Sequence, residues 1–421
     1  MAENGTGAQR AAVHPGTRRS TPRRALLLAG AVLVAAFGVL APASPASAHA
    51  VLVETVPDSG AVVQTAPDSV ALTFNEPIRL VTRDFSVVAP NGRNVQHGDP
   101  HLTGDGSMVE IPLDKGLPRG TFLVSYRIIS ADSHPVAGGF SFSLGAPSKT
   151  AAATSGGSDA AEDPVVAAAM PVARYLGFAG LVLLVGPTLF LMSMWPRRLS
   201  RGGPAKVIWL GVALVGVASL AELYLEVPYS TGGGLLSASY PDFIGTMNSR
   251  FGWAHLARLI QLAASVPLLA IVTSSRRNTL AVGEKIALAL MTAVGLLSWG
   301  FGGHPSTAHA PILTVLADGV HLGAMSVWLG GLLMLFGFLL RRARPAELVA
   351  VLPVWSRLAG WLVGLLAVTG IVQASMQLGS VDALVSSTYG ALIITKAVIF
   401  SLILGTAYFS RRAVRRAVLG A

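Results

Sequence analysis

Residues 312–340 read ILTVLADGVHLGAMSVWLGGLLMLFGFLL, and the ionisable side chains in this run are Asp318 and His321. A helix crosses a hydrocarbon core about 30 Å thick with about 20 apolar residues, so this stretch is long enough to span a membrane. Ionisable groups are costly inside a bilayer, which makes the two exceptions candidates for function. The stretch therefore predicts a transmembrane helix that carries chemistry.

Comparable apolar runs predict that this helix belongs to a bundle. Six more can be drawn, at residues 166–195, 206–227, 252–274, 281–302, 353–377 and 388–410. Charged residues make up 12% of the 421-residue chain, against about 25% in soluble domains. Hydrophobic residues make up 52%, and the mean hydropathy is +0.60. We predict an all-α polytopic transmembrane bundle of about seven spans over residues 166–410, embedded in the lipid bilayer.

The net charge of +10 is concentrated in alternate loops and in a basic tail at residues 411–421. An excess of Lys and Arg marks cytoplasmic loops. The basic residues follow spans one, three, five and seven: Arg197, Arg198, Arg201, Lys206, Arg276, Arg277, Lys285, Arg341, Arg342, Arg344, Arg411, Arg412, Arg415 and Arg416. This pattern predicts a cytoplasmic C-terminus in the cell membrane and argues against nucleic-acid binding.

The first 48 residues have the organisation of a signal peptide. A basic segment precedes the apolar run at residues 25–40, and Ala46 and Ala48 supply small residues for cleavage. The alternative is a first transmembrane helix, for which the run is short. Cleavage after Ala48 would make His49 the mature N-terminus.

Residues 49–146 have a β-rich pattern. Strand-like runs at 70–74, 85–88, 122–129 and 140–144 are separated by Gly, Pro, Asn and Asp turns. This spacing predicts an extracytoplasmic all-β sandwich. The Ala, Ser, Gly and Asp-rich segment 147–165 then reads as a flexible linker to the bundle.

A metal site can be drawn on the exported domain. A terminal His49 offers an amine and Nδ1, while Asp132 and His134 face the same way on an extended segment. Two imidazoles, an amine and a carboxylate suit Cu(II), and less well Ni(II). The chain contains no cysteine, which excludes thiolate sites. The alternative is that Asp132 and His134 are ordinary loop residues.

Three blocks of this domain resemble the CopC family: HAVLVETVPDSG at 49–60, LTFNEP at 72–77 and DSHPVAGGFSF at 132–142. CopC proteins are extracytoplasmic copper carriers with a cupredoxin-like sandwich. The resemblance implies that His49, Asp132 and His134 are Cu(II) ligands. Some members also have a Met-rich Cu(I) site, which this sequence lacks, so the resemblance implies a form that binds Cu(II) alone.

Ionisable residues also gather toward the predicted outer side of the bundle, where they could form a copper path: Glu222, Glu226, His255, His304, His309, Asp318 and His321, with Met325 as a soft ligand. The alternatives are loop polarity, a helix-packing hydrogen bond and, for Met325, simple packing. Arg258 and Lys396 lie within spans three and seven. Each is expected to pair with a carboxylate or to extend toward a headgroup.

The bundle resembles the CopD family of copper-handling membrane proteins in DGVHLGAMSVWLGGL at 318–332, in SRFG at 249–252 before Arg258, and in TYG at 388–390 before Lys396. CopD often occurs beside or fused to CopC. The resemblance implies a membrane protein of copper handling rather than an enzyme. No phosphate-binding loop for an ATP-driven pump is visible.

The leading hypothesis is a copper protein that captures Cu(II) outside the membrane and passes it into the bundle for import or homeostasis. Cu(I) is the form expected to move through the bundle, after reduction by a partner reductase, and an extracytoplasmic copper chaperone is a further candidate partner. Two alternatives remain: a haem-binding oxidoreductase with His255 and His321 as axial ligands, and a copper sensor without transport.

One extra residue before His49 should lower Cu(II) affinity at least tenfold, or ~1.4 kcal/mol. The insertion removes the amine–imidazole chelate and keeps every side chain. Competition titration followed by electron paramagnetic resonance would measure the loss, after mass spectrometry has shown that the parent chain begins at His49. Unchanged affinity would contradict the assignment.

Overall fold

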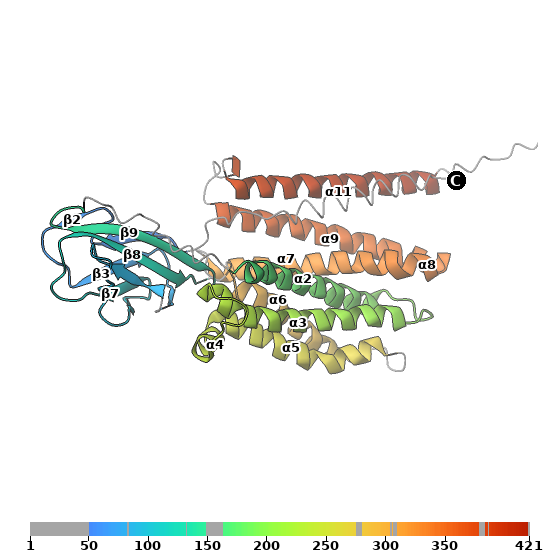
Figure 1. The fold of residues 1–421 in the computed structure, drawn as a ribbon. Coiled ribbons are helices and arrows are strands. Elements are labelled where there is room, and N and C mark those ends of the chain that lie inside the picture. The colour runs from blue at the N-terminus through green and yellow to red at the C-terminus, as the bar shows by residue number, and fades with distance from the viewer. Residues whose placement is uncertain are drawn as a thin grey trace, which may run out of the picture. The chain divides into compact units, whose positions relative to one another are not determined.

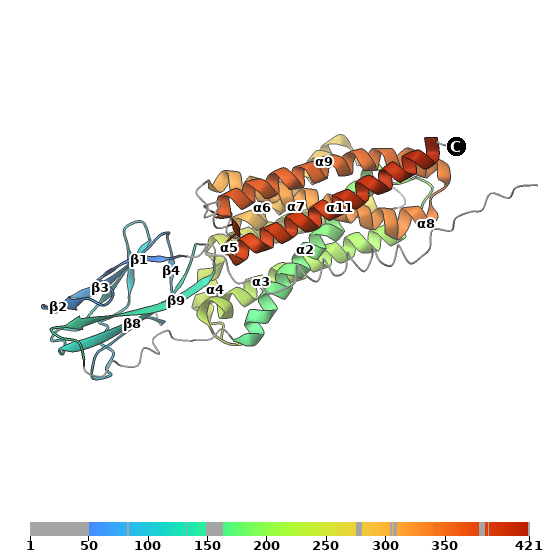
Figure 2. The same cartoon turned by 90° about the horizontal axis from the view of Figure 1, so that it is seen from above.

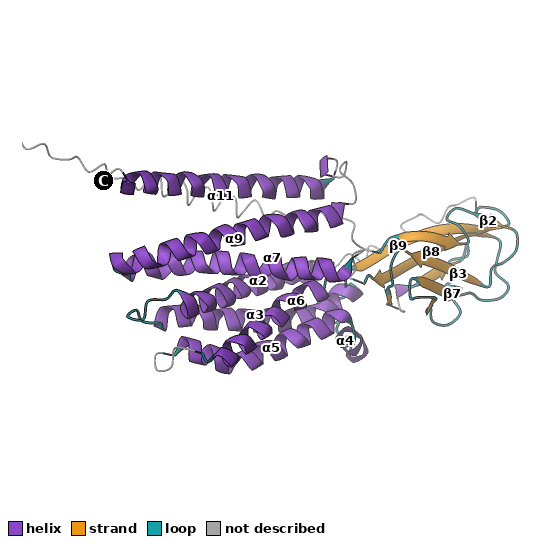
Figure 3. Cartoon of the chain, turned by 180° about the vertical axis from the view of Figure 1, so that it is seen from behind, coloured by secondary structure: helices purple, strands orange, loops and turns teal. Residues whose placement is uncertain are grey.

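The computed structural model describes residues 50–81, 84–131, 133–148, 163–274, 280–303, 305, 310–378, 384–385 and 387–419. The described residues from 50 to 378 belong to one compact unit, and the helix after them belongs to a second one. The strands and the helices come from separate stretches of the chain (Figures 1 and 3).

The strands form a sandwich of two sheets, as predicted. One sheet has the order β1 (Leu52–Val56), β3 (Ser69–Phe74), β7 (Met108–Pro112) and β6 (His101–Thr103). The other has the order β2 (Val62–Val63), β9 (Pro135–Leu144), β8 (Gly120–Ile129) and β4 (Arg79–Leu80), and β5 (Ser86–Val88) also pairs with β8. The four predicted runs correspond to β3, β5, β8 and β9.

Alternation of apolar side chains places the core between the sheets. Val70, Leu72 and Phe74 of β3 point inward, and Phe122 of β8 stacks on Phe142 of β9 with ring centroids 5.1 Å apart. Strands β8 and β9 form a long antiparallel pair that runs from Gly120↔Leu144 to Ile129↔Pro135 (Figure 2). Residues 130–134 therefore form the turn at one end of the longest hairpin.

The helical part follows the predicted spans closely. Its elements are α2 (Pro164–Ser193), α3 (Gly202–Thr231), α4 (Tyr240–Met247), α5 (Arg250–Thr273), α6 (Val282–Phe301), α7 (Pro311–Met334), the π-turn η3 (Leu335–Leu339), α8 (Leu340–Arg342) and α9 (Pro345–Leu378). Among the described residues, six helices are long and apolar enough to cross a membrane. They coincide with the first six predicted spans.

The seventh predicted span, 388–410, falls in α11 (Thr388–Leu419), which belongs to the second unit. Its described apolar part is Gly390–Gly405, shorter than the other six. The short helix α4 was not predicted. Ser239 caps α4 by accepting a hydrogen bond from the Asp242 amide, and the exposed Tyr240 and Ile244 lie on this helix.

Glycines bring α2 close to two other helices. A Cβ atom on Gly180 would stand 2.8 Å from the Val215 nitrogen of α3, and one on Gly186 would stand 2.6 Å from the Gly330 Cα of α7. A Cβ on Gly211 would likewise stand 2.8 Å from the Gly180 carbonyl oxygen. Such small residues let membrane helices approach backbone to backbone.

Gly186→Ala should destabilise the bundle by about 1–3 kcal/mol, because its methyl group overpacks the α2–α7 crossing. Thermal unfolding in detergent would measure the loss. Gly364→Ala on α9 is the matched control, since a Cβ there meets nothing within 4 Å. Equal unfolding temperatures for the two variants would contradict the packing argument.

Candidate functional site

The turn between β8 and β9 holds His134 in a defined backbone position. The Ser130 amide donates to the His134 carbonyl at 2.9 Å, and the Ser130 hydroxyl donates to the same oxygen at 2.8 Å. The His134 amide in turn donates to the Ser130 hydroxyl at 3.2 Å. Ser133 has a φ of 71°, in the left-handed region that non-glycine residues seldom adopt. The local sequence therefore builds a tight turn that presents the His134 side chain.

The other two predicted ligands of the sandwich, His49 and Asp132, lie outside the described residues. The chain next to His49 is nevertheless anchored. Ala50 is buried in the sandwich core, and the Val51 amide donates to Asn75 Oδ1 at 2.7 Å. The Asn75 amide donates back to the Val51 carbonyl at 3.1 Å. Asn75 thus fixes the strand that leads away from the predicted N-terminal ligand.

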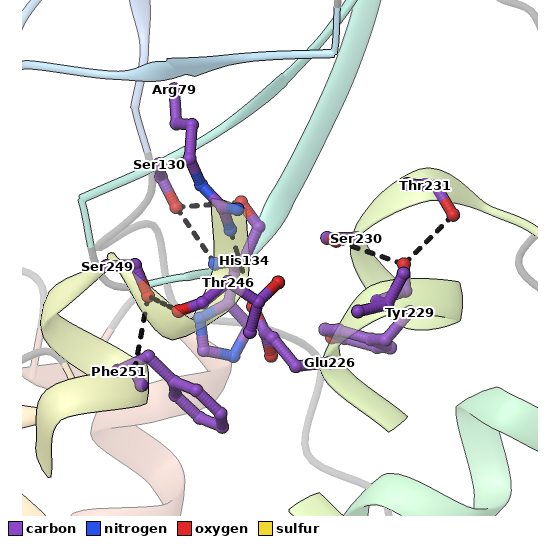
Figure 4. A network of polar contacts seen from close by, with 12 residues as sticks. Arg79, Ser130, His134, Glu226, Tyr229, Ser230, Thr231, Thr246, Ser249 and Phe251 are labelled. Carbon is purple, nitrogen blue, oxygen red and sulfur yellow. Dashed lines mark hydrogen bonds and ion pairs between the residues drawn. The ribbon is translucent and has the colours of Figure 1, made fainter. Parts of the chain in front are cut away.

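His134 faces residues of the helical bundle. Its Nε2 lies 3.5 Å from Arg174 Nη1 of α2, and its ring stands edge-on to Tyr229 of α3 with centroids 6.1 Å apart. A guanidinium group can only donate, so Nε2 would be the acceptor in a hydrogen bond between these two atoms. An unprotonated imidazole nitrogen is also the form that binds metal ions. Figure 4 shows His134 in a cluster with Glu226 and Tyr229.

Glu222 and His255 form a buried pair between α3 and α5. Glu222 Oε2 lies 3.1 Å from His255 Nε2, and the side chains are 4% and 2% exposed. His255 Nδ1 lies 2.9 Å from the Phe251 carbonyl, to which it can only donate. With Nδ1 protonated, the contact between Nε2 and Glu222 has two possible forms. Either one proton is shared between Nε2 and the carboxylate, or Nε2 is protonated and the two side chains form an imidazolium–carboxylate pair.

Arg258 contacts α6 and lies near the Glu222 carboxylate of α3. Its Nε donates to the Ser298 hydroxyl at 3.0 Å and its Nη2 to the Ser298 carbonyl at 3.3 Å. The guanidinium carbon lies 3.9 Å from the ring centroid of Trp299, which is a cation–π contact. Helix α6 therefore supplies the described hydrogen bonds of this buried charge, and the Glu222 carboxylate of α3 interacts with it electrostatically. Lys396 is exposed on α11, in the other unit.

Asp318 and His321 lie on α7 and contact α9. Gln373 Nε2 donates to Asp318 Oδ1 at 3.4 Å, and His321 Nδ1 lies 2.9 Å from the Thr369 hydroxyl. Met325 is half-buried further along α7. The predicted loop residues His304 and His309 lie outside the described residues.

Glu226 contacts the sandwich. It is buried, and Arg79 Nη2 of β4 lies 4.0 Å from its Oε1 (Figure 4). Burial lowers the pKa of Arg79, and the carboxylates of Glu226 and Asp242 act in the opposite direction. Of the two predicted α3 carboxylates, Glu222 therefore faces α5 and Glu226 faces the sandwich.

A cavity of about 270 Å³ is lined both by His134 of the β8–β9 turn and by residues of the helical bundle. Its wall includes His134, Glu222, His255, Arg258, Trp299 and Asp318. Within the described part of the chain, no three His, Asp or Glu side chains come close enough to form a metal cage. The cavity wall thus carries metal-ligand side chains at separate places. His321, Glu226 and Met325 are not among the residues that line it.

Sequence reasoning missed Arg174, Ser298 and Trp299. A lone arginine in the first third of an apolar span was a usable signal for Arg174, because a charge there needs a partner. Ser298 and Trp299 carry no such signal, since both residue types are common in membrane helices.

Comparisons with known families match three successive parts of the chain. The CopC domain matches residues 52–145, the N-terminal domain of copper resistance protein D-like proteins matches 163–311, and copper resistance protein D matches 349–420. The first match covers the sandwich, and the other two cover most of the described helices.

Individual proteins are similar either to most of the chain or to one part of it. Copper transport protein CutJ of Bacillus subtilis is 27% identical over 86% of this chain and 68% of its own length. Copper resistance protein D of Pseudomonas syringae pv. tomato is 25% identical over 59% of this chain and 82% of its own. Copper resistance protein C of Xanthomonas campestris pv. juglandis is 34% identical over 27% of this chain and 91% of its own.

Glu222→Ala should destabilise the protein by about 3–5 kcal/mol, because it leaves His255 and Arg258 buried without the carboxylate. Unfolding in detergent would measure the effect. Glu54→Ala, at an exposed position of β1, is the control and should leave stability nearly unchanged. A similar small effect from both variants would show that the buried pair adds little.

Proposed function

The chain belongs to the CopC family, and we propose that it captures copper outside the membrane and passes it into its own helical bundle. It joins a CopC domain to copper resistance protein D domains in one multi-pass membrane protein, which is the basis of the proposal. Its relatives are named for copper transport and copper resistance. The proposal extends this role to a direct transfer between the two parts of the chain.

The capture site in this proposal consists of His49, Asp132 and His134 at the mature N-terminus and the β8–β9 turn. Amine, imidazole and carboxylate donors favour Cu(II). The hydrogen-bonded backbone of His134 supports this role, because a preformed ligand loses less freedom when it binds. Signal-peptide cleavage after Ala48 is part of the proposal, since it creates the amine ligand.

One observation carries the transfer step: His134 lines the same cavity as Glu222, His255 and Asp318. A metal ion that leaves His134 would meet oxygen and nitrogen donors along the wall of the same cavity. Copper arriving between Glu222 and His255 would take the place of the proton at Nε2, because both groups are metal ligands when deprotonated. Glu222 and His255 would then form the first copper-binding site inside the bundle.

The bundle would next carry copper toward the cytoplasm, for import or homeostasis. The basic loops after spans one, three and five support this orientation, with the sandwich outside and the C-terminus inside. N- and O-rich Cu(II) coordination is slow to release the ion, so reduction to Cu(I) by a partner reductase fits the transfer. In this scheme the chain moves copper and is not itself an enzyme.

The haem alternative has less support in the structure. Both ring nitrogens of His255 already contact protein atoms, Phe251 O and Glu222 Oε2. The cavity of about 270 Å³ is also smaller than the roughly 300–1,000 Å³ of pockets that hold organic ligands. A metal ion fits such a space more readily than a macrocycle does.

Two variants should separate capture from transfer. His134→Ala should lower Cu(II) affinity at least tenfold, because it removes an imidazole ligand. Glu222→Gln should keep that affinity and reduce radioactive copper uptake by cells several-fold, because it keeps the side-chain shape and loses the anionic ligand.

Paramagnetic resonance would follow binding, and scintillation counting would follow uptake. His97→Ala is the matched control, since His97 is an exposed sandwich histidine that contacts Asp114 rather than the cavity. Undiminished uptake by Glu222→Gln would contradict the transfer path. Equal copper accumulation with and without the protein would favour a sensor.

A further inference from the structure

Arg127 joins the sandwich to the bundle through the end of a helix. It lies on β8, is 3% exposed and comes from the strand that leads into the His134 turn. Its Nε donates to the Ser230 carbonyl at 3.0 Å, and its Nη2 donates to the Tyr229 carbonyl at 3.4 Å. Both oxygens belong to the last turn of α3, which ends at Thr231.

The end of α3 is suited to receive a cation. The last four carbonyls of a helix have no partner within it, and they carry the negative end of the helix dipole. A guanidinium group is planar and offers several donors in fixed directions, so it can bond two carbonyls at once. Arg127 therefore acts as a C-terminal cap that comes from another domain.

Gly232 leaves room for this cap. It ends α3 with a φ of 70°, in the left-handed region. A Cβ atom there would stand 2.8 Å from Arg127 Nη1 and 2.9 Å from the guanidinium carbon. Glycine thus serves both the helix turn and the close approach of the arginine.

Two further contacts flank the cap on the same helix. Arg79 of β4 lies 4.0 Å from Glu226, one turn before the capped carbonyls, and the His134 ring stands against Tyr229 (Figure 4). The contacts come from neighbouring strands β4, β8 and the β8–β9 turn, so one edge of the sandwich meets one helix end.

We propose that Arg127 and Gly232 form a docking latch that holds the sandwich on α3 and thereby places His134 at the cavity. Arg127 is assigned a positioning role, because its described hydrogen bonds go to main-chain oxygens of α3 and it is not among the residues of the cavity wall. The inference rests on the proposed function for its purpose, the transfer of copper. It changes the role expected for segment 147–165, since a docked donor does not depend on a flexible tether to reach the bundle.

Distance measurements between the two parts test the latch. The chain has no cysteine, so spin labels at Val53→Cys on β1 and Tyr240→Cys on α4 report without background. These positions are 65% and 77% exposed. The full chain in lipid nanodiscs should give a narrow distance distribution in electron–electron double resonance. Arg127→Ala should broaden it severalfold, and Arg127→Lys, which keeps a cationic donor, should restore part of the order.

Gly232→Ala provides an independent variant that leaves the sandwich unchanged. It should broaden the distribution as Arg127→Ala does, and the double variant should be no broader than either single one, because both break the same contact. Arg93→Ala, at an exposed arginine paired with Asp114, is the matched control and should leave the distribution narrow.

Copper measurements on the same variants separate docking from folding. Arg127→Ala should retain Cu(II) affinity and lose copper uptake severalfold, whereas a misfolded sandwich would lose both. Identical distributions in the parent and Arg127→Ala chains, or additive broadening in the double variant, would overturn the latch. If the parent chain gave a narrow distance distribution but took up no copper, the latch would still be supported and the proposed function would be refuted.

Discussion

A charged group inside a membrane-spanning bundle must find its partners within the protein, and this constraint organises the end of the bundle that meets the sandwich. Glu222 binds His255 there, and Arg258 is held by Ser298 and Trp299. Each partner comes from a different helix, so the polar groups tie α3, α5 and α6 together. Glu222 Oε1 and Arg258 Nη1 have no hydrogen-bond partner among the described residues, so polar atoms remain available beside the cavity that these residues line.

The β8–β9 hairpin serves two purposes with one element. Its turn presents His134, and its β8 strand carries the arginine that caps α3. Since both residues belong to one strand pair, the turn that carries the predicted ligand is placed by the same hairpin that contacts the end of α3. The predicted copper ligand and the entry to the bundle are therefore related through a few strand residues rather than through a long linker.

Much of the fold could be predicted from the sequence because its signals are long. Six spans appear at the predicted places, and the four strand runs of the sandwich were found. Strands β1 and β7 were missed although each has five residues. Strands β2 and β4, with two residues each, were missed because alternation needs more residues to be visible. The helix α4 was missed for the same reason, with only eight residues.

The candidate site was predicted less completely, because sequence position does not tell which helix faces which. Asp318 and His321 lie three residues apart, yet only Asp318 lines the cavity. Glu222 and Glu226 lie one turn apart and have partners in different domains. The hydrogen-bond partners of Arg258 depend on how α5 packs against α6, and the sequence of α5 alone does not predict that packing.

The glycine contacts of α2 have a consequence for how such a bundle can move. Gly180 and Gly211 join α2 to α3, and Gly186 and Gly330 join it to α7, with backbones in direct contact. Sliding α3 or α7 along α2 would bring side chains against main-chain atoms, so these three helices resist movement relative to one another. Relative movement of the helices near His255 would therefore be easier at α5 and α6 than at the α2–α3 and α2–α7 crossings.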